Sequence, residues 1–357
     1  MEKFYKLLKQ YDYRLPAQLI AQSPASPRDS ARIMVYNKRG GKINFDTFKN
    51  LGRYLPKNAV LVFNQTKVWP ARFEVVNPSG GKARLLYIGL DNKLIKALSD
   101  RPLNPGTVVG FAPGRMPNRQ NGKSINFSVI KKVGQFYYLK PSFPLARLQD
   151  ILITYGITPL PPYIKHSPLT EKQKRREYQS VFAKSGLSVA APTASLHFTK
   201  RLIGSLMREG IGEAYLRLDV GLGTFAPLKE ENIHTRKLHR EFYLIDKHTA
   251  AFLNAAKKQG RPIIAVGTTA ARTLESASTN HGQLTKLSDD TELFISPGYK
   301  FKFIDGLITN FHVPKSSLLM LVSALVGRSK LLTLYQQAVA KRFRFFSFGD
   351  AMLILPQ

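Results

Sequence analysis

The stretch RPIIAVGTTAAR, residues 261–272, combines the signature of a buried strand with the start of a helix. Its first half is short, apolar and rich in β-branched residues, which is typical of a strand covered on both faces. Gly267 marks the junction, and Thr268 or Thr269 can cap the helix that follows. A strand that leads directly into a helix is the building unit of an α/β protein.

The same alternation continues on the carboxyl-terminal side of this stretch. The runs ELFIS (292–296) and GLITNF (306–311) indicate two further strands, and the apolar run 318–325 after Pro314 predicts a buried helix. Strands that alternate with helices predict a parallel or mixed sheet with helices packed on it.

A different pattern occupies residues 59–152, where short strand-like runs alternate with turn clusters rich in Asn, Pro and Gly. Short strands at this spacing favour a small antiparallel barrel. The strand-like runs are 60–63, 83–88, 108–111, 125–130 and 135–139.

Together these patterns predict one α/β domain assembled from both ends of the chain and interrupted by a second domain. We expect residues 1–60 and 156–357 to form a barrel-like α/β catalytic domain, and residues 61–155 to form an inserted antiparallel β-barrel. A chain of 357 residues is long enough for two domains that each bury a core.

The charge of the chain favours a polyanionic partner. Lys and Arg number 54 against 23 Asp and Glu, which gives a formal charge of +31. Such a field attracts nucleic acid, although a generally basic proteome would give the same imbalance. The basic residues are spread through folded-type sequence, which suits a surface that binds a structured RNA.

Several other classes are disfavoured. The chain has no cysteine, which excludes disulfides, iron–sulfur clusters and thiolate zinc sites. His234, His239 and Glu241 lie close together but match no zinc-protease spacing, so we expect no metal. The first residues lack an apolar signal core, and no apolar run reaches the about 18 residues of a membrane span. We therefore expect a soluble, cytoplasmic protein.

Polar residues stand inside the otherwise apolar segment VAAPTASLHFT, 189–199. In one interpretation Pro192 and Thr193 open a helix whose free N–H groups face a pocket together with His197. In the other, Thr193 caps a core helix and His197 is a hydrogen-bonded interior histidine. The segment alone does not decide between them.

Glycine and hydroxyl motifs suggest ligand contacts elsewhere. The run LDVGLGTF, 218–225, resembles the first motif of Rossmann-type methyltransferases, although a tight turn without a ligand explains it equally well. The helix start at Thr268 and Thr269, with Arg272, suits a carboxylate or phosphate, or is an ordinary cap. His312 and Lys315 follow a strand end, where α/β proteins tend to bind ligands.

Ten motifs, in this order along nearly the whole chain, resemble one family. They are VFNQTKVWPAR (62–72), PLPPYI (159–164), YQ (178–179), AAPTASLHFT (190–199), GLGTF (221–225), AVGTT (265–269), RTLES (272–276), FISPGY (294–299), LITNFH (307–312) and FFSFGDAML (345–353). The chain thereby resembles the S-adenosylmethionine:tRNA ribosyltransferase-isomerases of queuosine biosynthesis.

The resemblance implies an enzyme that moves the ribosyl part of S-adenosylmethionine onto 7-aminomethyl-7-deazaguanine at the tRNA wobble position. The product is epoxyqueuosine, and adenine and methionine are released. The resemblance also implies an α/β domain joined to a β-barrel, with S-adenosylmethionine as co-substrate and no further cofactor. We expect a monomer whose partners are this tRNA and S-adenosylmethionine, with no membrane.

The reaction needs a base for the 5′-methylene beside the sulfonium and a proton for the departing adenine. The acid–base candidates, without assigned roles, are His197, Asp219, Glu241, His312 and Asp350. The candidates for contacts with S-adenosylmethionine are Thr193, Gly221, Gly223, Thr224, Phe225, Thr268, Thr269 and Arg272, with the methionine carboxylate at the helix start. The candidates for RNA phosphates are Lys315, Arg342 and Arg344.

Some positions depart from the family pattern. Asp219 and Arg236 stand where the family commonly has histidines, which argues against imidazole catalysis at these positions in this chain. Ser195 replaces a glycine beside His197. Two alternatives remain open on sequence grounds: a Rossmann-type RNA methyltransferase that uses 219–225 as its cofactor loop, and a non-catalytic tRNA-binding relative.

Overall fold

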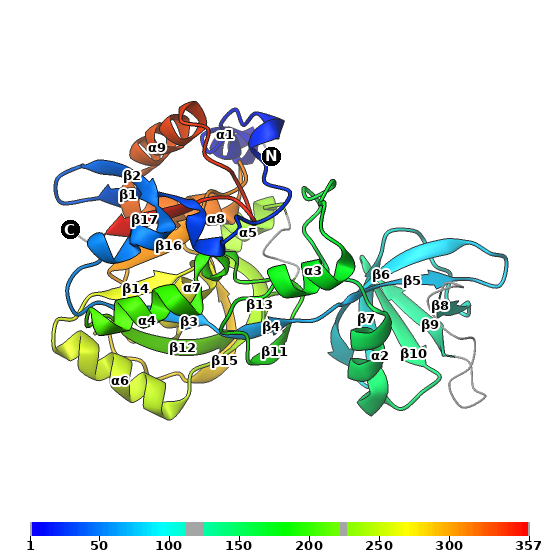
Figure 1. The fold of residues 1–357 in the computed structure, drawn as a ribbon. Helices are drawn as coiled ribbons and strands as arrows, with labels where there is room; N and C mark the ends of the chain where they lie inside the picture. The colour runs from blue at the N-terminus through cyan, green and yellow to red at the C-terminus, as the bar shows by residue number, and fades with distance from the viewer. Residues whose placement is uncertain (1, 112–124, 222–226, 356–357) are drawn as a thin grey trace. The chain divides into compact units, whose positions relative to one another are not determined.

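The computed structural model describes residues 2–111, 125–221 and 227–355 (Figure 1). The chain divides into two compact units. The larger comprises Met1–Lys67, Pro161–Leu169 and Arg176–Gln357, and the smaller comprises Val68–Leu160 and Thr170–Arg175.

The larger unit is built on a nine-stranded mixed sheet. In spatial order its strands are β15 (Ser288–Leu293), β13 (Lys237–Leu244), β12 (Gly212–Leu218), β3 (Val60–Asn64), β14 (Ile263–Val266), β16 (Gly306–Asn310), β17 (Ala351–Leu355), β1 (Arg32–Asn37) and β2 (Ile43–Thr47).

The four central strands β12, β3, β14 and β16 run parallel to one another. The outer pairs β13–β15, β16–β17 and β1–β2 are antiparallel, while β17 and β1 are parallel. Residues 60–63 of the central strand β3 and all of β14 are continuous apolar runs, because both faces of these strands are covered by other elements.

Alternate residues of each central strand enter two different cores. On β3, Val60 and Val62 pack with α6, α7, α8 and α9, whereas Leu61 and Phe63 pack with α4 and η3. The helical segments of the larger unit are α1 (Glu2–Lys9), η1 (Ala17–Leu19), η2 (Arg28–Ser30), η3 (Phe48–Arg53), η5 (Thr193–His197), α4 (Lys200–Arg208), α5 (Glu230–Thr235), α6 (Lys247–Lys258), α7 (Thr268–Ala277), α8 (Ser317–Val326) and α9 (Arg328–Ala340).

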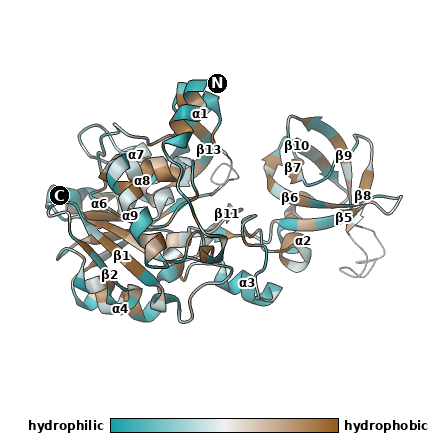
Figure 2. Cartoon of the chain, turned by 90° about the horizontal axis from the view of Figure 1, so that it is seen from above, coloured by the Kyte–Doolittle hydropathy of each residue, from teal (hydrophilic) through white to brown (hydrophobic). Residues whose placement is uncertain are grey.

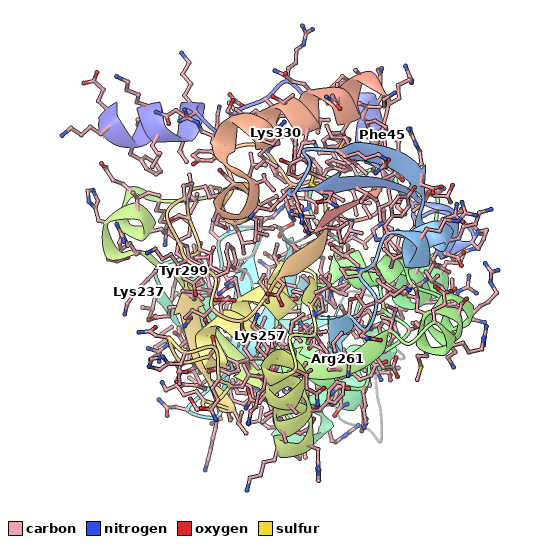
Figure 3. All side chains as sticks on the ribbon, turned by 90° about the vertical axis from the view of Figure 1, so that its left-hand side faces the viewer. Phe45, Lys237, Lys257, Arg261, Tyr299 and Lys330 are labelled. Atoms are coloured by element: carbon pink, nitrogen blue, oxygen red, sulfur yellow. The ribbon has the colours of Figure 1, made fainter. Side chains whose placement is uncertain are left out.

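Basic side chains lie over aromatic rings on the face shown in Figure 3. The Lys330 ammonium is 5.7 Å from the ring centre of Tyr36, and the Lys257 ammonium is 5.8 Å from that of Phe303. Lys257 also forms an ion pair with Asp305 at 2.8 Å. These residues use part of the positive charge of the chain in cation–π and ionic contacts within the fold.

The smaller unit is a closed barrel in which every pairing is antiparallel. Its inward side chains alternate with outward polar ones, as on β6, and Phe73, Phe127 and Leu139 fill the interior. In closing order the strands are β10 (Phe136–Pro141), β7 (Leu94–Ser99), β6 (Lys82–Asp91), β5 (Arg72–Val76), β8 (Val108–Phe111) and β9 (Asn126–Val133).

The remaining elements are short. In the smaller unit, η4 (Leu145–Arg147) leads directly into α2 (Leu148–Tyr155). The helix α3 (Glu171–Glu177) is strongly hydrophilic, as its teal colour in Figure 2 shows. A separate two-stranded sheet pairs β11 (Ser185–Ser188) with β4 (Thr66–Val68).

The predicted α/β class with an inserted antiparallel barrel is confirmed. One detail differs: the sheet of the larger unit, expected to be barrel-like, has β15 and β2 as edge strands in its described part. The apolar run 60–63, expected in the barrel segment, forms the central strand β3 of the large sheet. Its lack of polar alternation reflects burial on both faces.

No single helix in the described ranges has both the length and the apolarity of a membrane span; α8 and α9 pass that test only as a pair, bent by 110°.

Candidate active site

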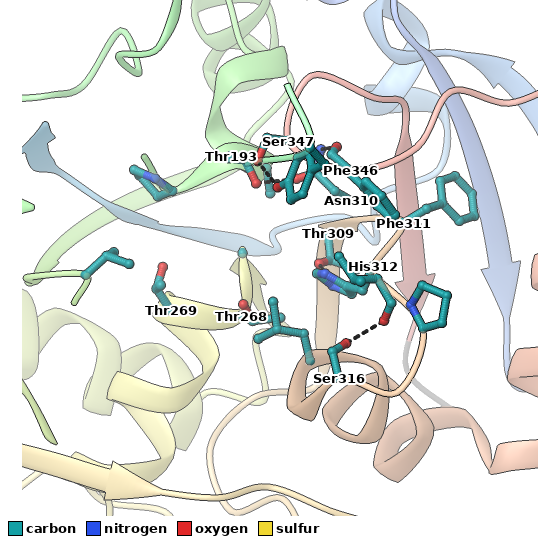
Figure 4. A pocket seen from close by; sticks show the side chains of 18 of the residues that line it. Thr193, Thr268, Thr269, Thr309, Asn310, Phe311, His312, Ser316, Phe346 and Ser347 are labelled. Carbon is teal, nitrogen blue, oxygen red and sulfur yellow. Dashed lines mark hydrogen bonds between the residues drawn. The ribbon is translucent and has the colours of Figure 1, made fainter. Parts of the chain in front are cut away.

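The larger unit contains a cavity of about 420 Å³ where its parallel strands end. Val220 follows β12, Gly267 follows β14 and Phe311 follows β16, and all three line the cavity. Phe311 is labelled in the close view of Figure 4. Ligands of open α/β sheets bind at this carboxyl edge. The segments 162–163, 191–194 and 346–347 close its other sides.

The turn between β14 and α7 brings the amino end of the helix to the cavity wall. Gly267 has φ 93° and ψ 154°, a conformation essentially restricted to glycine, and its N–H donates to the carbonyl of Ile308 at 2.8 Å. Thr268 and Thr269 both line the cavity. The Thr269 hydroxyl is buried and has no hydrogen-bond partner among the described residues. A helix start with a free hydroxyl is suited to an anionic group.

A polar wall faces this helix start. The Thr193 hydroxyl donates to Asn310 Oδ1 at 2.8 Å, and Asn310 Nδ2 donates to the carbonyl of Phe346 at 3.1 Å. Nearby, the hydroxyls of Tyr163 and Ser347 lie 2.6 Å apart, and burial raises the pKa of Tyr163 to about 12. These contacts fix neutral hydrogen-bonding groups around the cavity.

His312 brings an imidazole to the cavity. Its Nε2 lies 2.7 Å from the Thr309 hydroxyl, and Nδ1 has no hydrogen-bond partner in the described part of the chain. Two tyrosine hydroxyls bind the backbone of His312. The His312 N–H donates to the Tyr335 hydroxyl at 2.9 Å, and the His312 carbonyl accepts from the Tyr13 hydroxyl. Burial lowers the pKa of His312 to about 3, so the ring is neutral at physiological pH.

This pKa predicts a loss of stability in acid. The unfolded chain takes up a proton at His312 near pH 6.5 and the folded chain only near 3. His312 therefore does not reduce the free energy of unfolding above pH 6.5, and it reduces this free energy progressively as the pH falls from 6.5 towards 3. At about pH 5 the loss amounts to about 2 kcal/mol. Urea unfolding of the unsubstituted chain and of His312→Gln at about pH 7.5 and pH 5 measures it. An identical pH dependence in both proteins would contradict the assignment.

Lys315 lies at the same cavity, as part of its lining. Its ammonium is 2.8 Å from a carboxylate oxygen of Asp12, and both side chains are about half exposed. The backbone N–H of Lys315 donates to the carbonyl of Tyr11 at 3.0 Å, and its φ of 58° is unusual for a residue with a side chain.

Two candidates from the apolar motifs are held away from this cavity. His197 is buried, with Nδ1 3.0 Å from the carbonyl of Ala194 and Nε2 2.8 Å from that of Gly349. Asp350 is buried in an ion pair with Arg344 at 3.1 Å and accepts the N–H groups of Arg32 and Arg344. Both side chains join distant segments of the fold. The neighbouring candidate Arg342 is exposed, with φ 55°.

Glu241 and Arg272 form a buried ion pair, each about 4% exposed. The other carboxylate oxygen of Glu241 accepts the Gly221 N–H at 2.9 Å, and Arg272 Nε donates to the carbonyl of Leu293 at 3.1 Å. Arg272 Nη2 has no partner among the described residues. The pair therefore connects α7 to the start of the glycine motif, whose Gly223, Thr224 and Phe225 lie outside the described residues.

Asp219 belongs to a separate polar cluster. It forms an ion pair with Arg217 at 2.5 Å and accepts from the Thr66 hydroxyl at 2.9 Å and from the Leu187 N–H at 3.2 Å. It is not among the residues that line the cavity.

Of the predicted site residues, the cavity brings together Thr193, Thr268, Thr269, His312 and Lys315. Sequence reasoning did not select Tyr163, Asn310 and Ser347, although each lies in a motif quoted for the family resemblance. Among the described residues, no group of three or more His, Asp or Glu side chains is arranged to hold a metal ion.

A cavity at the carboxyl edge of a parallel sheet, with a free helix start and a neutral imidazole, defines an α/β enzyme that acts on a small organic ligand. Residues 8–354 match the model of a family described as queuosine biosynthesis protein. The chain belongs to this family.

Curated relatives match over nearly their whole length. A protein of Carboxydothermus hydrogenoformans is 46% identical over 98% of this chain and 99% of its own, and one of Desulforamulus reducens is 42% identical over the same shares. Both are named S-adenosylmethionine:tRNA ribosyltransferase-isomerase. The crystal structure of a Thermotoga maritima S-adenosylmethionine tRNA ribosyltransferase is also similar, with 31% identity, a TM-score of 0.53, and coverage of 97% of this chain and 100% of that one.

Proposed function

We propose that the cavity at the ends of β12, β14 and β16 is the active site of an S-adenosylmethionine:tRNA ribosyltransferase-isomerase. The chain transfers and isomerises the ribosyl group of S-adenosylmethionine onto 7-aminomethyl-7-deazaguanine in tRNA, giving epoxyqueuosine, adenine and methionine. The similarity to curated enzymes over the full length supports this activity and does not favour a methyltransferase or a non-catalytic tRNA-binding protein.

The reaction sets two requirements for proton transfer. The sulfonium acidifies the adjacent 5′-methylene, so a neutral base has to take a carbon-bound proton, and adenine leaves more readily when it receives one. His312 supplies the base. With its proton on Nε2, donated to Thr309, the ring keeps the Nδ1 lone pair free to accept. The proton taken from carbon is then available for the departing adenine.

The amino end of α7 binds the carboxylate of the methionine part. The observation that carries the proposal is that the free Thr269 hydroxyl at this helix start and the neutral His312 imidazole line the same cavity. Arg272 acts one turn further along α7 by holding Glu241 and, through it, Gly221. We propose that Lys315 at the cavity and the exposed Arg342 contact RNA phosphates. The enzyme acts as a monomer in the cytoplasm, where its tRNA substrate is found.

Replacement of Thr269 by valine tests the carboxylate site. Valine keeps the shape but removes the hydroxyl, and one hydrogen bond to a charged group is worth about 1.5–3 kcal/mol. The KM for S-adenosylmethionine is expected to rise by about 10- to 100-fold, while the KM for tRNA stays unchanged. Thr333→Val on α9, away from the cavity lining, is the matched control. Equal kinetics for the two variants would contradict this site.

Mass spectrometry of a reaction with S-adenosylmethionine and tRNA that carries 7-aminomethyl-7-deazaguanine tests the activity itself. Adenine, methionine and epoxyqueuosine are the expected products. Formation of S-adenosylhomocysteine and a methylated nucleoside would instead establish a methyltransferase. Intact tRNA binding without turnover would establish a non-catalytic relative.

A further inference from the structure

A second hollow of about 300 Å³ in the larger unit is lined almost entirely by polar and charged side chains. It runs beside α4, with Arg201, Ser205 and Arg208 on one side and Lys49 of η3 and Asp29 of η2 on the other. We call it the α4 groove. Nothing in the proposed chemistry of the cavity uses it.

The three α4 residues form one stripe because they are spaced four and three positions apart, which places them on the same helix face. Leu202 and Leu206 of α4 are buried in the core, and Leu202 also borders the groove. Along the axis the stripe from Arg201 to Arg208 extends about 10 Å, at about 1.5 Å per residue. The α4 side of the groove therefore presents two guanidinium groups, with the neutral Ser205 between them.

The charges in the groove do not cancel. Asp29 is 1% exposed and is held by the Thr199 hydroxyl at 2.9 Å and Arg201 Nη2 at 3.0 Å, so it acts as an anchor for Arg201. Lys49 and Arg208 are exposed, and neither has an acidic partner within 4 Å in the described part of the chain. Glu209, at the end of α4, accepts from the Ser205 hydroxyl at 3.1 Å.

The α4 groove is connected to the active-site cavity along the chain. Thr193 of η5 lines the cavity, η5 leads through Thr199 into α4, and α4 lines the groove. A small hollow lined by Arg28 and Ser347 borders residues of both, since Ser347 also lines the cavity and Arg28 directly precedes Asp29 of the groove. The groove therefore lies on the helix that follows a wall of the cavity along the chain.

We propose that the α4 groove binds the phosphodiester backbone of the RNA substrate next to the nucleotide held in the cavity. Arg201, already oriented by Asp29, positions the backbone, and Lys49 and Arg208 neutralise phosphates and release their counterions. The proposal rests on the proposed function, because it requires that the nucleotide in the cavity belongs to an RNA.

The test compares two charge-reversal variants with the same change in net charge. One is Lys49→Glu with Arg208→Glu in the groove. The other is Lys247→Glu with Lys258→Glu on α6, where both lysines are exposed and without acidic partners among the described residues. The tRNA dissociation constant is measured by filter binding at several salt concentrations, and the KM for S-adenosylmethionine is measured alongside.

The groove variant is expected to bind tRNA at least about tenfold more weakly than the α6 variant at physiological salt. Its plot of log affinity against log salt is expected to be shallower by about 1.4–1.8, because each of the two lost phosphate contacts removes about 0.7–0.9. The KM for S-adenosylmethionine stays unchanged. Lys49→Gln with Arg208→Gln gives a smaller effect in the same direction and keeps the test valid if the reversal disturbs folding.

Equal binding by the groove and α6 variants would overturn the proposal, whether both matched the unsubstituted chain or both were weakened alike. Failure of the unsubstituted chain to bind tRNA at all is a separate result, and it would overturn the proposed function on which the groove depends.

Discussion

His312→Gln is expected to lower kcat by about 10²–10⁴, the usual contribution of a positioned general base. Glutamine can still hydrogen-bond the Thr309 hydroxyl, but it cannot take a proton from the 5′-methylene. Because the imidazole makes no charged contact, the KM values for S-adenosylmethionine and tRNA are expected to change little. Single-turnover kinetics with saturating substrates measures the effect.

With His312 as the proposed base, the substrate has to contribute to its own activation. A ring with a pKa of about 3 is neutral at every physiological pH but is a weak base, so the acidity that the sulfonium gives the methylene is needed.

The variant His197→Gln distinguishes the roles of the two buried histidines, His197 and His312. His197 lies outside the cavity, so its replacement is expected to reduce stability and to leave kcat largely intact. The reverse pattern would move the base to His197.

Glu241→Ala is expected to destabilise the larger unit by about 3–5 kcal/mol, because Arg272 is left as an uncompensated buried charge. Arg272→Leu is expected to lower the free energy of unfolding by a similar amount, because it leaves the Glu241 carboxylate as an uncompensated buried charge. The double variant Glu241→Leu with Arg272→Leu removes both charges, and its cost is expected to fall well below the sum of the single replacements. Urea unfolding, monitored in the larger unit, measures all three.

The pair also has a kinetic consequence that packing alone would not have. Glu241 holds the N–H of Gly221, where the glycine motif begins, and the double variant loses this contact. The KM for S-adenosylmethionine is therefore expected to rise in the double variant even where its stability recovers. Strictly additive stability costs, or an unchanged KM in the double variant, would contradict this role.

The sequence predicted well those features that depend on neighbouring residues. The strand, glycine and helix start at 261–272 predicted α7 and its threonines at the cavity, since a strand end, a turn and a cap are local features. His312 was predicted for the same reason, because it stands two residues after the end of β16. The motifs of the family resemblance lie between residues 62 and 353, inside the range 8–354 that matches the family model.

Features that depend on distant partners could not be predicted. His197 bonds the carbonyl of Gly349, which is 152 positions away, and Asp350 accepts the N–H of Arg32, which is 318 positions away. Neither the periodicity nor the spacing of residues indicates that such polar groups form hydrogen bonds between distant segments and do not contact a ligand. The ion pair between Arg272 and Glu241 could not be predicted for the same reason. The sequence suggested that the Arg272 guanidinium binds a ligand carboxylate, whereas in the structure it binds the carboxylate of Glu241.

The central claim is that S-adenosylmethionine binds in the cavity between α7 and His312, and a crystal structure of the chain with S-adenosylmethionine bound tests it most directly. The account predicts the methionine carboxylate within hydrogen-bond distance of the Thr269 hydroxyl and the first N–H groups of α7, with the 5′-methylene facing the His312 ring. A carboxylate bound elsewhere, or a 5′-methylene out of reach of His312, would contradict it.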